Sequence, residues 1–153
     1  MSLSSYKSKR NLKKSGEPKA EIKKDSKKLI FVVQKHDASH LHYDFRLEED
    51  GILKSWAIPK EPPKVKGIKR LAVHVEDHPL DYANFSGVIP KGNYGAGTVK
   101  IWDKGTYKLE EKKKDKIVFE LNGKKLKGKY VLLKTNYGAS EEQKKKSWLL
   151  MKI

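Results

Sequence analysis

Strict alternation of polar and apolar residues between positions 40 and 48 constrains the fold of this chain more than any other feature. The side-chain period of a β-strand is two residues, so the stretch predicts a strand with one apolar and one polar face. The apolar face is Leu41, Tyr43, Phe45 and Leu47, and the polar face is His40, His42, Asp44, Arg46 and Glu48. Such a strand needs a hydrophobic core against its apolar face.

The polar face carries imidazole, carboxylate and guanidinium groups in consecutive positions. Same-face neighbours on a strand lie roughly 6.5–7 Å apart, so their side chains can converge on one ion. We expect His42 and Asp44 to share a metal, His36 to fold back as a third ligand, and Arg46 to hold an anion bound to that metal. A solvated strand face is the alternative, but three histidines and an aspartate within nine residues favour the metal site.

Further short strands separated by turn signals predict the fold class. A buried strand is expected at 29–34, and residues 52–58 follow a turn as the return strand of a hairpin. Later strands are expected at 70–76, 98–102, 106–109, 117–121, 130–134 and 147–153, with a turn at 103–105 and a polar, helical excursion at 141–146. No long helical pattern occurs, so we predict an all-β fold: a compact β-barrel of short antiparallel strands with minor helical segments.

The strand at 70–76 alternates in the same way. We expect Leu71, Val73 and Val75 to form its apolar face and Arg70, Ala72, His74 and Glu76 a second functional face, before a turn that begins at Asp77. The glycine-rich stretch 87–97 lacks the Gly-Lys-Ser/Thr ending of a phosphate-binding P-loop. Its glycines are therefore predicted to serve tight turns and close backbone approach.

Charge points to a polyanionic partner. The formal net charge of the 153 residues is +16, which favours nucleic acid first and an anionic membrane second. Residues 1–28 contain ten Lys or Arg against three acids and hardly any large apolar side chain. We predict a flexible basic N-terminal arm over 1–28 and one domain over 29–153.

Other features narrow the class of protein. The chain has no cysteine, which excludes disulfides, thiolate zinc sites and thiol catalysis. It has no apolar run of membrane-spanning length and no signal-peptide core, so we expect a cytoplasmic protein without a membrane partner. We also expect it to be a monomer.

Motifs spread over the whole chain carry a family resemblance. They occupy residues 31–36, 41–48, 54–60, 75–82, 85–97, 102–105 and 148–152, together with Tyr6, Lys9-Arg10 and Glu17-Pro18 near the start. With them the chain resembles the phosphoesterase family that occurs as a module of bacterial ligase D and as stand-alone bacterial and archaeal proteins. The resemblance is to the stand-alone form, since no ligase or polymerase module accompanies it.

The resemblance implies a manganese-dependent 3′-end-healing enzyme, with Zn²⁺ or Co²⁺ as alternative metals. Such an enzyme removes a 3′-terminal ribonucleoside and then the remaining 3′-phosphate from DNA or RNA ends, including primer-templates, in repair by end joining, and it can act beside a separately encoded ligase or polymerase. Carried onto this sequence, the metal ligands are His36, His42 and Asp44; the phosphate-handling groups are Arg46, His78 and Tyr82; the supporting catalytic residues are Lys60, Arg70, Glu76 and Gln34; and Lys9 and Arg10 contact nucleic acid.

Two positions depart from the family pattern, and two other classes of protein remain open. Asn11 stands where aspartate is common, and His40 stands where arginine is frequent, which makes a phosphate contact at the rim weaker or pH-dependent.

A non-haem iron oxygenase on a β-barrel would use a similar ligand set but leaves the charge of +16 unexplained. A non-catalytic nucleic-acid-binding module would explain that charge but not the clustered imidazoles.

Overall fold

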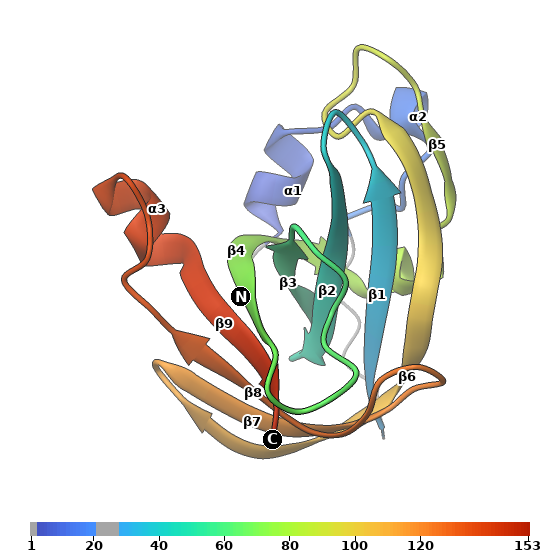
Figure 1. Ribbon diagram of the computed structural model, residues 1–153. Coiled ribbons are helices and arrows are strands. Elements are labelled where there is room, and N and C mark those ends of the chain that lie inside the picture. The colour runs from blue at the N-terminus through green and yellow to red at the C-terminus, as the bar shows by residue number, and fades with distance from the viewer. Residues whose placement is uncertain (1–2, 21–27) are drawn as a thin grey trace.

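The barrel closes where the first long strand of the chain pairs with a strand that begins sixty residues after the first one ends. In the computed structural model, which describes residues 3–20 and 28–153, β1 (Leu29–Asp37) pairs with both β2 (Leu41–Glu49) and β6 (Gly97–Lys113). The strand order is β1-β2-β3-β4-β9-β8-β7-β6-β5, and every pairing between these strands is antiparallel. Eight strands form the closed barrel, and β5 pairs only with β6 (Figure 1). The predicted all-β barrel is confirmed.

Of the remaining elements, those at 52–58, 69–79, 116–122, 127–134, 141–146 and 147–152 lie near predicted positions, whereas those at 4–8, 12–15, 80–84 and 87–89 were not predicted. The strands are β3 (Ile52–Ile58), β4 (Lys69–Pro79), β5 (Gly87–Ile89), β7 (Lys116–Asn122), β8 (Lys127–Lys134) and β9 (Ser147–Lys152). The helices are α1 (Ser4–Ser8), α2 (Leu12–Ser15), the 3-10 helix η1 (Leu80–Asn84) and α3 (Glu141–Lys146). Within 3–20 and 28–153, none of the helices has the length and apolar character needed to cross a membrane.

The interior of the barrel is filled by the apolar faces of its strands. On β2 the predicted face points inward, with Tyr43, Phe45 and Leu47 buried, whereas Leu41 at the strand start is 46% exposed. Phe31 from β1 and Trp56 from β3 join the same cluster. Because side chains alternate along each strand, Gln34 and His36 of β1 and His42, Asp44 and Arg46 of β2 point to the outer face of the barrel.

A second apolar cluster lies on that outer face and differs from the expectation for the N-terminus. Tyr6 is fully buried and Leu3 nearly so, against Val32, Leu53 and Tyr82. Residues 3–20 therefore do not extend away from the barrel as an arm, and α1 and α2 lie outside the barrel strands (Figure 1). The rest of the predicted arm includes 21–27, which lies outside the described residues, and the boundary at 28/29 stays a prediction.

The predicted turn at 103–105 is wrong, because β6 runs through it. The Asp103 carboxylate is buried and accepts backbone N–H bonds from Lys104, Lys124, Lys125 and Leu126. Asp103 thus looks like a turn residue in the sequence but serves the loop between β7 and β8. A register shift between Val33 and Gln34 of β1 lets β6 stay paired past this point.

The faces of β4 are also reversed relative to the prediction. Ala72 is fully buried in the barrel core, and His74 lies against Trp56 with ring centroids 5.3 Å apart, so this row points inward. Leu71 and Val73 are only partly buried. The register of β4 against β3 shifts between Leu53 and Ser55, and β4 continues to Pro79 instead of turning at Asp77. The shift is a β-bulge that brings Glu76 and His78 to the outer face.

Candidate active site

A pocket of about 320 Å³ opens on the outer face of the barrel. Its walls come from the N-terminal segment, from β1 to β4, from η1 and from the glycine-rich stretch that follows β5. Most residues that line it belong to the predicted site or to the quoted motifs, among them Arg10, Glu17, His36, His42, Asp44, Arg46, Glu76, His78, Tyr82 and Tyr94. Residues that are far apart in the chain therefore meet in one place.

The three predicted metal ligands converge in this pocket. Nδ1 of His36 lies 3.5 Å and Nε2 of His42 lies 3.3 Å from Oδ2 of Asp44. One ligand atom from each residue lies within 4.8 Å of the others. Metal–ligand bonds of about 2.0–2.2 Å place neighbouring ligand atoms roughly 3–3.5 Å apart, so the two imidazole–carboxylate distances fit a shared ion.

Backbone carbonyls orient both imidazoles toward Asp44. Nε2 of His36 lies 2.7 Å from the carbonyl of Gly95, and Nδ1 of His42 lies 3.0 Å from the carbonyl of His40. A carbonyl only accepts, so each of these nitrogens carries the proton and donates it. The other nitrogen of each ring then offers its lone pair to the space beside Asp44, which is the arrangement that metal-binding histidines use.

The electrostatics of the trio call for a cation between the ligands. Burial opposes ionisation of Asp44, but Arg46 and the two imidazoles outweigh it and hold the pKa of Asp44 well below its usual range. Burial also disfavours charged His42, yet Asp44 raises the pKa of His42 above 6.5. The carboxylate thus attracts a proton onto His42, and a divalent metal can take the place of that proton. The donor set of two imidazoles and one carboxylate fits Mn²⁺, Fe²⁺, Zn²⁺ or Co²⁺.

Arg46 is held beside the trio by fixed neighbours. Its Nε donates to Oε1 of Gln34 at 2.7 Å, and its Nη1 donates to Oγ of Ser55 at 2.8 Å. The amide nitrogen of Gln34 in turn donates to the backbone carbonyls of Tyr82 and Phe85. Nη2 of Arg46 faces Asp44 at 3.5 Å. Gln34 thus positions Arg46 with one N–H edge toward the trio, and the predicted anion-binding role of Arg46 stays a prediction.

His78 lies between two guanidinium groups. Its Nδ1 is 2.9 Å from the carbonyl of Glu76, and its Nε2 is 3.2 Å from Nη2 of Arg10. Burial first, and then Arg46 and Arg10, lower its pKa well below 6.5. His78 is therefore neutral, with Nδ1 donating and Nε2 accepting. The predicted role as general acid stays a prediction, and it requires a bound phosphate to counter the two positive charges.

The N-terminal segment contributes a buried ion-pair network that the sequence interpretation underrated. Arg10 donates from Nε to Glu17 at 2.9 Å and from Nη1 to Glu76 at 3.0 Å. Tyr82 donates its hydroxyl to Glu17 at 2.7 Å, and the Tyr82 ring lies under the Arg46 guanidinium. Glu17 and Ser55 entered the sequence interpretation only as parts of motifs and were given no role in the site, although a serine in the apolar strand 52–58 was a visible signal.

The structure does not bring every predicted site residue into the pocket. Lys60 and Arg70 lie in a separate hollow of about 270 Å³, where Arg70 donates to the carbonyl of Glu61. Lys9 lies at the edge of the site and pairs with Glu76 at 3.4 Å. His40 is exposed. Asn11 caps α2 without a side-chain hydrogen bond and does not line the pocket.

Comparison with known proteins shows the family of the chain. The family described as the DNA Ligase D 3′-phosphoesterase domain matches residues 34–134. The chain belongs to this family. Among its relatives, the multifunctional non-homologous end joining protein LigD of Pseudomonas aeruginosa is 49% identical over 157 residues, which cover 98% of this chain and 18% of that protein. LigD of Mycolicibacterium smegmatis is 43% identical over 159 residues, covering 96% of this chain and 20% of that protein.

The relatives are much longer than this chain. LigD of Mycobacterium tuberculosis is 51% identical over 110 residues, which cover 69% of this chain and 14% of that protein. The chain thus spans about a fifth or less of each relative. The predicted resemblance is confirmed by the family match, and the oxygenase interpretation loses its basis.

Proposed function

We propose that this chain is a metal-dependent phosphoesterase that heals 3′ ends of DNA or RNA for end-joining repair. It removes a 3′-terminal ribonucleoside by phosphodiester cleavage and then the 3′-phosphate, leaving a 3′-OH for a separate ligase or polymerase. The observation that carries the proposal is the convergence of His36, His42 and Asp44 beside Nη2 of Arg46. Family membership supports the reaction class.

The residues of the pocket divide the work. His36, His42 and Asp44 would hold Mn²⁺, which supplies Lewis-acid charge for a phosphate oxygen when bound. Arg46 binds a further phosphate oxygen through a charge-assisted hydrogen bond. His78 and Tyr82 both contact the Arg46 guanidinium. To act on the phosphate, they would exchange their present hydrogen bonds to the Glu76 carbonyl and to Glu17 for bonds to a phosphate oxygen. Glu17 and Glu76 fix Arg10, so this second guanidinium stays close to His78.

Two labelled strands test the proposal. One ends in a single ribonucleotide and the other in a 3′-phosphate, and products are resolved over time after chelation and addition of Mn²⁺. We expect the 3′-phosphate species to appear and then decay to 3′-OH. Asp44→Asn should abolish both steps, because it removes the only carboxylate of the trio.

Asp50→Asn is the matched control. Asp50 is exposed in the β2–β3 turn with φ 51°, a conformation that asparagine adopts readily, and it does not line the pocket. A second readout does not need turnover: Mn²⁺ should raise the melting temperature of wild type and of Asp50→Asn but not of Asp44→Asn. Phosphate release by Asp44→Asn at the wild-type rate would contradict the assignment.

A further inference from the structure

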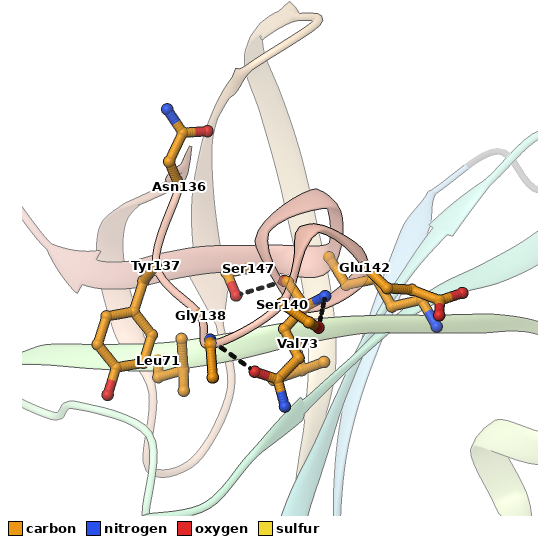
Figure 2. Close-up of a pocket in the computed structure, with 11 residues that line it drawn as sticks. Leu71, Val73, Asn136, Tyr137, Gly138, Ser140, Glu142 and Ser147 are labelled. Atoms are coloured by element: carbon orange, nitrogen blue, oxygen red, sulfur yellow. Dashed lines mark hydrogen bonds between the residues drawn. The ribbon is translucent and has the colours of Figure 1, made fainter.

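A second and larger hollow lies beside the active-site pocket. It has a volume of about 1060 Å³ and separates the outer face of β4 from the chain segment 136–147 that includes α3 (Figure 2). Leu71 and Val73 form its floor, and Tyr137, Ser140 and Lys146 belong to its wall. The mechanism proposed above uses none of these residues.

The floor of this hollow is continuous with the metal site. In the strand registers Asp44 lies opposite Ala57, Ala57 opposite Val73, and Val73 opposite Ser147. These four side chains share the outer face, and Ala57 lines the active-site pocket while Val73 and Ser147 line the hollow. Neighbouring strands are roughly 4.7–4.9 Å apart, so the backbone of Val73 lies about 10 Å from that of Asp44. Only the small Ala57 side chain stands between them.

The wall of the hollow is held in place by its own hydrogen bonds. Ser140 accepts from the backbone N–H of Gln143, and the Gln143 side chain accepts from the N–H of Ala139 (Figure 2). Ser147 donates from Oγ to the carbonyl of Gln143 at 2.8 Å, which ties α3 to β9. The backbone of the segment is thus anchored at several points between Ala139 and Ser147.

The side chains presented there suit a nucleotide. Tyr137 lines the hollow and is 67% exposed, so its aromatic ring is open to a ligand. Lys146 makes no ion pair with any residue of 3–20 and 28–153. Asn136 and Gln143 offer amide groups, and Glu142 is the one acid of the lining. An aromatic face, amide groups and a free cation are what single strands meet on their binding proteins.

We propose that this hollow binds the nucleotides directly upstream of the 3′ end under repair, with a base stacked on Tyr137 and a phosphate near Lys146. The proposal rests on the proposed function, because it takes the 3′ end to lie at the metal site. Stacked nucleotides advance about 3.4 Å each along a strand, so the distance of about 10 Å from Asp44 to Val73 corresponds to roughly three nucleotides. The net charge of +16 favours this occupant over a cationic or neutral protein partner.

Binding without turnover tests the proposal directly. The probe is a fluorescent single-stranded oligonucleotide of eight residues with a 3′-phosphate, titrated without metal and followed by anisotropy. Tyr137→Ala should weaken binding by roughly 5- to 150-fold, the range for losing one base–aromatic stack. Tyr137→Phe keeps the ring and should bind like wild type. Tyr137 is exposed, so both variants should melt at the wild-type temperature.

Location and substrate length give a second test. A strand with 4-thiothymidine two to four positions from its 3′ end should crosslink to the segment 136–147. In the turnover assay, the ratio of kcat/KM for the eight-residue strand to that for a nucleoside 3′-phosphate should fall in Tyr137→Ala. Unchanged affinity in Tyr137→Ala, or crosslinks only elsewhere, would overturn the proposal, and the hollow would then be left for a protein partner. Absence of phosphate release by the wild-type protein would instead refute the proposed function. The two failures can be told apart, because the anisotropy measurement does not depend on turnover.

Discussion

Replacing Tyr6 by alanine should release the N-terminal segment without unfolding the barrel. Tyr6 is fully buried, its ring lies 5.2 Å from His78 and 6.1 Å from Tyr82 in edge-to-face contacts, and Arg10 stacks on it at 4.3 Å. Truncating a buried aromatic side chain costs about 3–5 kcal/mol. The cluster around Tyr6 is separate from the barrel core, so this loss should fall on docking of the segment.

Amide hydrogen exchange measures this prediction residue by residue. The N–H groups of Lys7 and Lys9 bond to carbonyls within the segment and report on its docking. In Tyr6→Ala their exchange should accelerate by roughly 150- to 5,000-fold, the factor that corresponds to 3–5 kcal/mol, while the barrel strands keep their protection. Tyr6→Phe, which loses only the hydroxyl bond to the carbonyl of Pro18, should change exchange by about 2- to 12-fold.

Two results would refute this reasoning. Equal acceleration in the barrel strands would show that the segment and the barrel unfold as one cooperative unit. Unchanged exchange at Lys7 and Lys9 would show that Tyr6 does not hold the segment.

Three further predictions test the fold around the site. Asp103→Asn leaves buried N–H groups of the β7–β8 loop without a full acceptor, so the free energy of unfolding should fall by about 1–3 kcal/mol in thermal melts. Gly92→Ala, at φ +89° with no atom within 4 Å, should lower the free energy of unfolding by only about 1–2 kcal/mol through backbone strain. Gly97→Ala places a Cβ 2.2 Å from the carbonyl of Asp37 at φ +144°, so it should destabilise the protein more than Gly92→Ala does and weaken Mn²⁺ binding at the adjacent strand end. Burial raises the pKa of Glu76, but the hydrogen bond from Arg10 outweighs burial, so the pKa of Glu76 lies below the ordinary 4.5. The ion pair should therefore stabilise the docked segment fully above pH 4.5 and lose this effect as the pH falls through the lower pKa of the folded state. Exchange of the segment amides measures this pH dependence, which should disappear in Glu76→Gln.

Alternation of polar and apolar residues with a period of two predicted most of the strands of the fold. The alternation from 40 to 48 predicted both the inward face of β2 and the clustering of His42, Asp44 and Arg46 on its outer face, because a strand face is a local property of the chain. The same rule failed on β4, where Ala72 and His74 face the core. There the choice of face depends on a bulge against β3 and on the space beside Trp56, which are properties of the assembled sheet.

The burial and docking of the N-terminal segment could not be predicted for a related reason. Tyr6 sits among lysines and serines, so no periodic pattern marks it as buried. Its burial depends on a surface built from Val32, Leu53 and Tyr82, and Arg10 meets Glu76 across a separation of 66 residues. Composition alone made this segment look like a solvated arm, whereas its few large side chains are the ones that dock.

The hydrogen bonds that orient the two imidazoles determine how much sequence variation two positions of the chain, 40 and 95, can tolerate. Position 40 orients His42 through its backbone carbonyl, so the side chain at position 40, a histidine in this sequence, can be exchanged without disturbing the His42 imidazole. Position 95 serves His36 in the same way, but a Cβ there would meet the His36 ring at 3.4 Å with φ at +75°. Among related sequences we therefore expect wide variety at position 40 and near-invariant glycine at position 95, a contrast between two residues that do the same job.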